Sequence, residues 1–400
     1  MKSMKLKLRQ LSVFQLNSFS QPLKKNVQYR NYSTAYKDTV KLKNDASNIS
    51  DTSLNLPSTT LKSFGTKTSY WNIKIYKNYD NVCVLEMNSN KVNCFTYDWL
   101  SSFKKSLKFI EDHHPGKSII LKSASPKIFS SGMDLKLVNK IQEIHHNHVK
   151  ETYAQIEPCM NPSREMMAAA SENIVHEYFK KHPHKFEQLT TTSIIPSIKN
   201  NDMDTLYRSM FSSIEYDKMT QIKVPYSLNL EYISNAIDYI GEFNDVFLKF
   251  LIHPNPTFSF VSGAALAGGL ALSVSADGLA VVNPTKIGLH ARSLGFCFPS
   301  SIHYVLNSRF TDQRNSYEIM LMGRSVSSYD ELHLLTNHLT INNFESLLKH
   351  ANKLSKRPVS RELKQFQIDN MKHYLEFNHA SIQVRFLNSF LFGIGPKELL

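Results

Sequence analysis

Residues 256–306, PTFSFVSGAALAGGLALSVSADGLAVVNPTKIGLHARSLGFCFPSSIHYVL, contain the pattern that decides the fold. Residues 256–261 predict a short buried strand, and the small apolar run from Ala264 to Val274 predicts a helix that begins at the pair Gly268-Gly269. A glycine pair at the start of a helix lets another backbone or a ligand approach closely, and the first helical amides have no partner inside the helix. Such amides suit a developing negative charge. A tight turn in an ordinary core is the alternative.

A second stretch, residues 119–135, has the sequence IILKSASPKIFSSGMDL, in which a strand pattern leads into the loop Phe-Ser-Ser-Gly-Met-Asp. The two stretches together, in this order, resemble the crotonase (enoyl-CoA hydratase/isomerase) superfamily. Further matches are Lys91-Val92-Asn93, Ile287-Gly288-Leu289 and Leu294-Gly295. Several spaced motifs in the right order are more specific than any one of them. The resemblance spans about residues 70–390 and is strongest to the mitochondrial Δ3-Δ2-enoyl-CoA isomerase branch.

The order of expected elements predicts an α/β fold with helices outside the sheets. Residues 71–87 alternate around a central turn and predict a hairpin, and Thr96 is a candidate N-cap of a helix that runs to Ile110. The resemblance implies the ClpP/crotonase-like form of this class, a spiral core of ββα repeats with C-terminal helices. We therefore expect an α/β core over residues 69–310 and a C-terminal helical region over residues 311–400.

Residues 142–228 interrupt the family pattern, which joins the flanking motifs through a much shorter helix. The stretch contains six histidines: His145, His146, His148, His176, His182 and His184. Histidines at such spacing can bind zinc, but no accompanying Cys or carboxylate pattern fixes a site. We expect a polar surface insert without a metal site, in which limited proteolysis cuts first.

The 400 residues have a formal net charge of +13, and residues 1–37 contribute eight basic residues and no acid to it. A basic, hydroxylated, amphipathic segment of this kind is typical of a mitochondrial transit peptide, and a disordered basic arm is the alternative. Residues 38–68 are rich in Asn, Ser, Thr and Lys and predict a disordered linker. The basic excess belongs mainly to the tail, so it is weak evidence for nucleic-acid binding. We predict a location in the mitochondrial matrix.

The four cysteines, Cys83, Cys94, Cys159 and Cys297, have no CxxC spacing. They fit a reducing compartment and no disulfide framework. Cys297 has no evident histidine partner, which favours a buried core thiol over a nucleophile. No run of 18 apolar residues occurs, so the sequence predicts no membrane span.

The resemblance implies a site formed mainly by the backbone. It assigns the amides of Met133 and Gly268 to an oxyanion hole, which would hold the thioester carbonyl of an acyl-CoA. It implies no separate cofactor, because coenzyme A enters as part of the substrate or ligand. The residues that it assigns to CoA binding are Phe129, Ser130, Ser131 and Asp134.

An enoyl-CoA isomerase also needs a carboxylate that moves a proton from C2 to C4. The isomerase branch carries it at the position of Ala291, the hydratase branch uses a second position at Ala271, and other isomerases use one near Pro299. None of the three is acidic, and alanine has no proton to give. His290 is the nearest titratable neighbour and a weak candidate base, the alternative being a loop imidazole.

Two functions follow from the resemblance. The first is an enoyl-CoA isomerase/hydratase-like protein of fatty-acid β-oxidation that acts on or binds acyl-CoA, with weak or absent turnover. The alternative is a non-catalytic crotonase-fold protein that binds acyl-CoA or serves as a scaffold or assembly subunit in mitochondria. An RNA- or ribosome-associated role rests only on basicity and is weaker. The resemblance also implies a homo-oligomer, most often a trimer.

Overall fold

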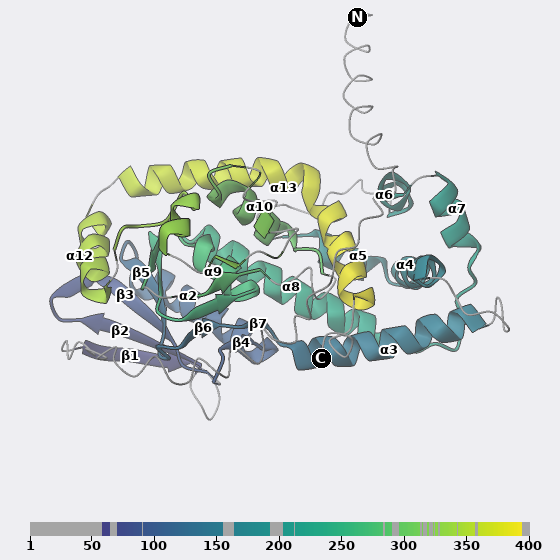
Figure 1. The fold of residues 1–400 in the computed structure, drawn as a ribbon, viewed down its shortest axis with the longest axis horizontal. Helices are drawn as coiled ribbons and strands as arrows, with labels where there is room; N and C mark the ends of the chain where they lie inside the picture. The colour runs from purple at the N-terminus through teal and green to yellow at the C-terminus, as the bar shows by residue number, and fades with distance from the viewer. Residues whose placement is uncertain are drawn as a thin grey trace, which may run out of the picture. The chain divides into compact units, whose positions relative to one another are not determined.

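A six-stranded sheet forms the framework of the protein (Figure 1). Its strands in chain order are β1 (Ser58–Phe64), β2 (Trp71–Tyr76), β3 (Tyr79–Met87), β5 (Ser118–Ser123), β8 (Thr257–Val261) and β10 (Gly278–Val281). They lie side by side in the order β1-β2-β3-β5-β8-β10. β1, β2 and β3 pair antiparallel, whereas β3, β5, β8 and β10 pair parallel. Parallel neighbours require crossover connections, here largely helical, so the sheet confirms the expected α/β class.

The computed structural model describes part of the chain, and all of that part belongs to one compact unit that spans residues 53–400. The predicted transit peptide and most of the predicted linker lie outside the described residues, and the predicted domain boundaries stay predictions. The described residues are 58–64, 70–89, 91–154, 164–192, 203–211, 213–282, 285–289, 296–312, 314, 318–319, 323, 325–326, 329–341, 343–356 and 359–393.

Two smaller sheets are built from short strands that follow the long ones along the chain. One contains β6 (Ile128–Ser130), β9 (Ala264–Leu266), β11 (Ile287–Gly288) and β12 (Ser325–Val326), in the order β12-β11-β9-β6. The other pairs β4 (Cys94–Phe95) with β7 (Gly132–Met133) in parallel. β6 and β9 also pair in parallel, so the loop after β5 and the loop after β8 are held next to each other.

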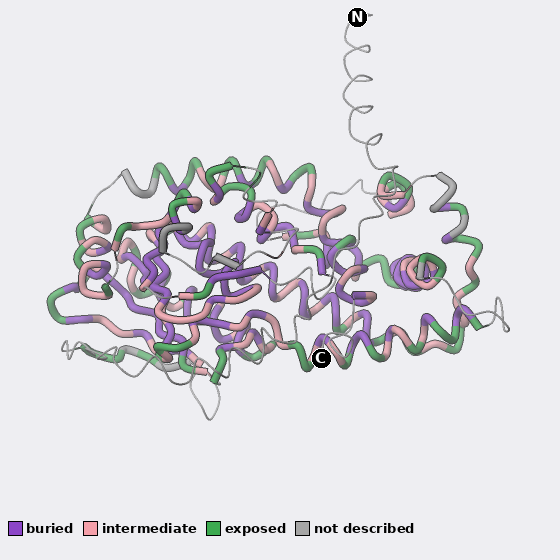
Figure 2. The backbone as a smooth tube through the Cα atoms, in the orientation of Figure 1, coloured by how far each residue is buried: buried purple, intermediate pink, exposed green. Residues whose placement is uncertain are grey.

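Helices cover both faces of the large sheet. α2 (Tyr97–His113) and α8 (Glu231–Leu251) pack on one face, and α12 (Phe344–Ser355) packs on the other. The described residues outside 142–228 also form α9 (Gly268–Ser275), α10 (Ser300–Arg309), the long α13 (Val359–Phe392) and a 3₁₀ turn at Tyr329–Leu334. Figure 2 shows burial concentrated on the parallel strands and on α8.

The two faces of the sheet are encoded by alternation. Along β3, Cys83 and Leu85 belong to the larger core cluster with α2 and α8, whereas Val82 and Val84 belong to the cluster beneath α12. Successive side chains of a strand point to opposite faces, so a strand with both faces covered is apolar throughout. The predicted hairpin and the predicted buried strand of residues 256–261 are both confirmed.

The start of α2 also follows the sequence prediction. Thr96 is its N-cap, and the Thr96 hydroxyl accepts a hydrogen bond from the Trp99 amide at 3.2 Å. Trp99, Phe103 and Ile110 are fully buried, at the spacing that places them on one face of a helix. Capping and amphipathicity are local properties, which is why this helix could be located from sequence.

The expectation of a polar surface excursion over residues 142–228 is wrong. The stretch contains the last part of α3 (Leu135–Ala154), then α4 (Arg164–Lys181), α5 (Pro183–Thr190), α6 (Met203–Met210) and α7 (Ser213–Gln221). α3 and α5 contact both α8 and α13, α4 contacts α13, and α7 contacts α4 and α6. Their buried apolar side chains belong to the same core cluster as the large sheet: Val149, Ala170, Ile174, Val175, Tyr178, Phe179, Phe186, Leu189, Tyr207, Tyr216 and Met219. We call residues 142–228 the insert.

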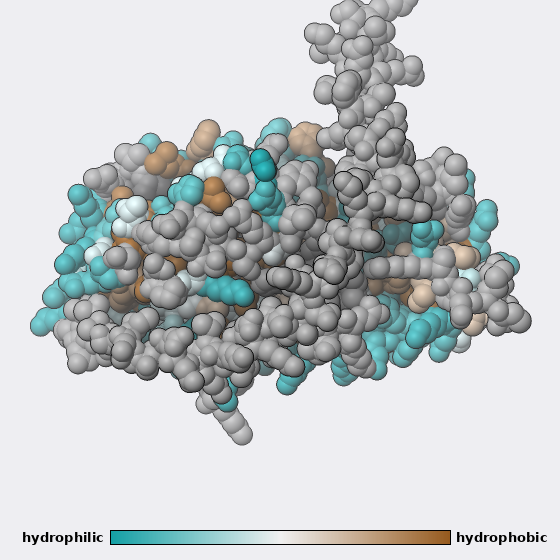
Figure 3. Space-filling view, viewed as in Figure 1, coloured by the Kyte–Doolittle hydropathy of each residue, from teal (hydrophilic) through white to brown (hydrophobic). Residues whose placement is uncertain are grey.

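The composition of the insert predicts a surface segment because it is polar on average, although its apolar residues recur at helical spacing. Ala170, Ile174 and Tyr178 follow one another four residues apart, as do Val175 and Phe179. In α4 the polar residues Ser171, Asn173 and His176 are buried together with these apolar ones, so a polar composition does not place this helix on the surface. Figure 3 shows the hydrophilic side of α3 exposed on the visible surface.

The linker prediction is corrected in part. Residues 58–64 of the expected disordered segment form β1, which pairs antiparallel with β2 along the edge of the sheet. None of the helices within the described ranges is long and apolar enough to cross a membrane.

Candidate functional site

The loop after β6 and the start of α9 approach each other through their backbones. Gly132 has a φ of +87°, and a Cβ added there would lie 2.7 Å from the amide nitrogen of Gly268. A Cβ added at Gly269 would lie 2.3 Å from the carbonyl oxygen of Ser130. Both separations are too short for a real side chain, so the contact requires glycine on each side. The segments that carry the Met133 and Gly268 amides are thereby brought together, and an oxyanion hole at these two amides stays a prediction.

Asn93 organises the loop that leads to Met133. Its backbone has a φ of +48°, and its buried amide nitrogen donates to the Ser123 hydroxyl at 2.8 Å and to the Phe129 carbonyl at 2.9 Å. Its side-chain oxygen accepts hydrogen bonds from the amide and the hydroxyl of Ser89. The Ser130 hydroxyl in turn donates to the Asn93 carbonyl at 2.8 Å. Asn93 is therefore a positioning residue of this loop, a role that the sequence analysis did not assign to it.

The first turn of α9 presents unbonded amides on the same side. Ala267, the N-cap residue, has a φ of +49°, and its own amide donates to the Gly288 carbonyl at 2.7 Å. The Ala271 amide makes the first bond of the helix, to the Ala267 carbonyl at 3.2 Å. The Gly268 amide precedes it and has no acceptor within the helix. The positive end of the helix dipole thus lies at Gly268, beside Gly132.

Aromatic side chains pack against the start of α9 and the loop after β6. A Cβ added at Gly268 would lie 2.9 Å from the Phe95 ring and 3.3 Å from the Phe243 ring. The Tyr239 hydroxyl donates to the Phe95 carbonyl at 2.7 Å and accepts from the Asp134 amide at 3.3 Å. Burial raises the pKa of Tyr239, so this hydroxyl stays protonated near neutral pH. Sequence reasoning did not identify Tyr239, because its partners lie more than 100 residues away.

The chain resembles a known protein family in sequence and known proteins in structure. Residues 77–163 match the sequence model of the enoyl-CoA hydratase/isomerase family. The human mitochondrial Δ3-Δ2-enoyl-CoA isomerase superposes with a TM-score of 0.50 at 14% identity, covering 81% of this chain and 92% of that one. An enoyl-CoA hydratase from Mycobacterium ulcerans also gives 0.50 at 13% identity, covering 80% of this chain and 100% of the other. The chain has the crotonase fold. No curated protein matches it significantly in sequence.

The crotonase fold places the residues assigned to CoA binding on and around this loop. The side chains of Phe129 and Ser130 are fully buried, and Ser130 accepts a bond from the Gly132 amide at 3.1 Å. The Asp134 carboxylate accepts from the Lys136 amide at 3.1 Å, which makes it a cap of α3. Ser131 donates its amide to the Val92 carbonyl at 3.0 Å. These contacts hold the loop, and CoA binding at the four positions stays a prediction.

The positions that the resemblance assigns to proton transfer fall in two groups. His290 and Ala291 lie outside the described residues, so neither the weak candidate base nor the replaced carboxylate is placed. Ala271 is fully buried in α9, and Pro299 is the N-cap residue of α10. Neither described position offers a titratable side chain.

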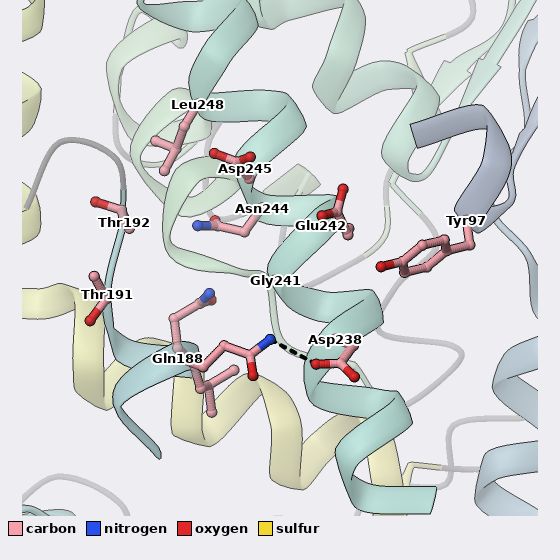
Figure 4. A pocket seen from close by; sticks show the side chains of 12 residues that line it. Tyr97, Gln188, Thr191, Thr192, Asp238, Gly241, Glu242, Asn244, Asp245 and Leu248 are labelled. Carbon is pink, nitrogen blue, oxygen red and sulfur yellow. Dashed lines mark hydrogen bonds between the residues drawn. The ribbon is translucent and has the colours of Figure 1, made fainter. Parts of the chain in front are cut away.

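Two cavities lie elsewhere in the crotonase fold. The larger, about 210 Å³, opens between α5 and α8 (Figure 4). Its carboxylates are paired: Asp238 with Lys185 at 2.8 Å, and both Glu242 and Asp245 with Lys104 at 2.6 and 3.2 Å. The smaller, about 160 Å³, lies between α8, α10 and α13. Neither cavity is lined by Met133 or Gly268.

Two histidines of the insert, His145 and His176, act as structural hydrogen-bonding groups. His145 is fully buried between the Tyr232 hydroxyl at 2.7 Å and the Ser171 hydroxyl at 2.6 Å, and burial lowers the pKa of His145 to about 3. His176 contacts the Asp204 carboxylate at 2.8 Å. Within the described ranges, no three His, Cys, Asp or Glu side chains are arranged to hold a metal ion. Cys297, expected in the core, is exposed because it lies in the loop before α10.

Proposed function

We propose that the protein binds acyl-CoA thioesters at the Met133 and Gly268 amides and isomerises or hydrates them weakly or not at all. The observation that carries this proposal is the backbone contact between Gly132 and Gly268, with its separation of 2.7 Å to an added Cβ. Two amides directed at one thioester oxygen stabilise the negative charge of an enolate. Because both donors belong to the main chain, they do not depend on the side chain at either position.

The expected loss of turnover follows from the chemistry of isomerisation. One base must remove a proton from C2 and return it at C4, while the oxyanion hole holds the dienolate. A positioned acid or base contributes about 10²–10⁴-fold to such a step. Since Ala291 occupies the position of the family's carboxylate, binding should persist while proton transfer fails.

Restoring the carboxylate tests the catalytic half of the proposal. Ala291→Glu should raise turnover of 3-hexenoyl-CoA by about 10²-fold or more. Ala291→Gln is the matched control, because it has nearly the same size and no transferable proton. If the unmodified protein already turns over at about 1 s⁻¹ or faster, and His290→Ala abolishes that activity, then His290 is the base and catalysis is not lost.

A second pair of variants tests the binding half. Gly132→Ala places a methyl group against the Gly268 amide and should abolish binding of hexanoyl-CoA in a calorimetric titration. Gly241→Ala on α8 is the matched control, because nothing lies within 4 Å of a Cβ added there. Equal hexanoyl-CoA affinity in Gly132→Ala and Gly241→Ala would contradict a ligand at the paired loops.

A scaffold or assembly role is the second candidate. It is favoured by the insert, whose helices add a buried layer to the crotonase fold, and by two cavities that do not reach the Met133 and Gly268 amides. If neither the unmodified protein nor Ala291→Glu binds hexanoyl-CoA, the scaffold role replaces the acyl-CoA role.

The proposed setting is fatty-acid β-oxidation in the mitochondrial matrix, with the chain assembled as a homo-oligomer such as a trimer. The support is the basic, acid-free composition of residues 1–37 and the likeness of the fold to a mitochondrial isomerase. Fusion of residues 1–40 to a fluorescent reporter should direct it to mitochondria. A reporter that stays in the cytosol would contradict this location.

A further inference from the structure

The smaller cavity combines a polar and an apolar wall. Its polar wall consists of Tyr304, Ser308 and Arg309 from α10 and Gln367 from α13. Its apolar wall consists of Leu251 and Ile252 at the end of α8 with Ile368 and Met371 from α13. None of these residues belongs to the loops around Met133 and Gly268, so the cavity is separate from the proposed acyl-CoA site.

A carboxylate near this cavity is already paired with a lysine. The Lys364 ammonium contacts both oxygens of Asp277, at 2.8 and 2.9 Å, and its side chain is only 5% exposed. One of those oxygens also accepts from the Thr257 amide at 2.9 Å and the Thr257 hydroxyl at 3.1 Å. Asp277 therefore has little capacity left to neutralise a second cation.

Arg309 is that second cation. Its Nε is buried and has no hydrogen-bond partner, and no carboxylate within the described ranges lies at ion-pair distance from its guanidinium. Burial lowers the pKa of Arg309 in spite of the attraction of Asp277. Burial also lowers the pKa of the nearby Lys364. His253 adds no charge near neutral pH, because burial lowers its pKa to about 4. The guanidinium of Arg309 therefore keeps one buried N–H donor without a partner and no carboxylate in direct contact, and Arg309 lines an open volume.

Buried charges in proteins are normally paired, and leaving one unpaired costs more than a lost neutral hydrogen bond. We propose that the cavity binds a small organic monocarboxylate, with the carboxylate on Arg309 and a short apolar chain against Leu251, Ile252, Ile368 and Met371. A single negative charge matches the single cation among the residues that line the cavity. A volume of about 160 Å³ suits a chain of about six carbons, since a cavity of about 150 Å³ accommodates benzene.

Calorimetric titration with hexanoate tests this site on the full chain. Arg309→Gln should weaken hexanoate binding by about tenfold or more, because a charge-assisted hydrogen bond is lost. Arg314→Gln is the matched control, since Arg314 is exposed, pairs with Glu318 and does not line the cavity. Hexanamide, which has the same shape without the charge, should also bind about tenfold more weakly.

A second variant keeps the test informative if Arg309→Gln folds poorly. Ile368→Phe fills the apolar wall and leaves the cation in place, so it should abolish hexanoate binding. Equal affinity for hexanoate in the unmodified protein and in Ile368→Phe would overturn the proposal. Inorganic phosphate that binds as tightly as hexanoate would also overturn it, because the site would then select charge without an apolar chain.

Discussion

The paired loops around Gly132 and Gly269 and the helices of the insert belong to one core, but they are held in different ways. The loops contact each other through main-chain atoms, with no room for a Cβ at either glycine. The insert is held by side chains such as Phe179, which pack among other apolar groups. A backbone contact has no rotamer with which to relieve a clash, whereas a side-chain contact can repack. The two regions should therefore respond differently to small changes in volume.

The largest effect is expected from Gly269→Ala. The added methyl group would lie 2.3 Å from the Ser130 carbonyl oxygen, and that carbonyl cannot move without disturbing β6. We expect a loss of about 5 kcal/mol in the free energy of unfolding, or no folded protein. Gly241→Ala is the control, and it should stabilise α8 by about 0.5–1 kcal/mol because glycine is a poor helix former. If urea denaturation finds Gly269→Ala as stable as the unmodified protein, the statement that the paired loops have no room for a Cβ is wrong.

The next effect tests whether the insert is part of the core. Phe179 is fully buried, so Phe179→Ala should cost about 3–5 kcal/mol in the free energy of unfolding. Phe179→Leu preserves most of the volume and should cost no more than about 1.5 kcal/mol. Tyr226, which is 93% exposed, serves as the control for substitution in the insert, and Tyr226→Ala should change stability by about 0.5 kcal/mol. A loss below about 1 kcal/mol in the free energy of unfolding of Phe179→Ala would mean that the insert is not part of the core.

The parts of the fold that sequence could predict are those with local causes. The hairpin, the capped helix α2 and the strands around residues 119 and 257 all follow from alternation, helical spacing and capping groups a few residues apart. The family motifs also located the paired loops, because close backbone approach leaves a visible pattern of glycines. The burial of the insert could not be predicted from its average composition, because that composition is polar and the apolar residues stand out only by their helical spacing.

The parts of the site that sequence could not predict depend on distant partners. Tyr239 holds the loop through Phe95 and Asp134, and no local pattern marks a tyrosine for that task. Asn93 likewise acts through Ser123 and a carbonyl 36 residues away. The use of Asp134 as a helix cap could have been anticipated, because aspartate is a preferred residue immediately before a helix.

An intermediate effect is expected from the pH dependence of stability. His145 has a pKa of about 3 in the folded protein, against about 6.5 when unfolded, so only the unfolded chain takes up a proton between these values. The contribution of His145 to the pH dependence of stability is absent above pH 6.5. Below that value it lowers the free energy of unfolding by about 1.4 kcal/mol per pH unit as the pH decreases. His145→Gln should remove the part of the slope that His145 contributes, a difference of roughly 2 kcal/mol between pH 6.5 and 5, while buried His253 keeps its own contribution.

The control for this measurement is His113→Gln, because His113 is exposed on the last turn of α2. Its variant should keep the slope of the unmodified protein. The substitution at His145 also removes hydrogen bonds to Tyr232 and Ser171, so the slope is the informative quantity and the absolute stability is not. An unchanged slope in His145→Gln would mean that His145 does not titrate as a buried neutral group.

The smallest effect concerns the ionic contact between the insert and α8. The Lys185 ammonium lies 2.8 Å from an Asp238 oxygen, and the two side chains are 17% and 35% exposed. Gln188 donates to the same oxygen at 2.7 Å, so Asp238 keeps a partner when Lys185 is replaced. A double-mutant cycle of Lys185→Met and Asp238→Asn should give a coupling energy of about 0.2–1 kcal/mol, and high salt should reduce it. If apolar packing holds the insert, this coupling must be smaller than the effect of Phe179→Ala. A salt-sensitive coupling energy above about 2 kcal/mol would show that the insert is held to α8 mainly by ionic contacts. Apolar side-chain packing would then not be what distinguishes the insert from the paired loops.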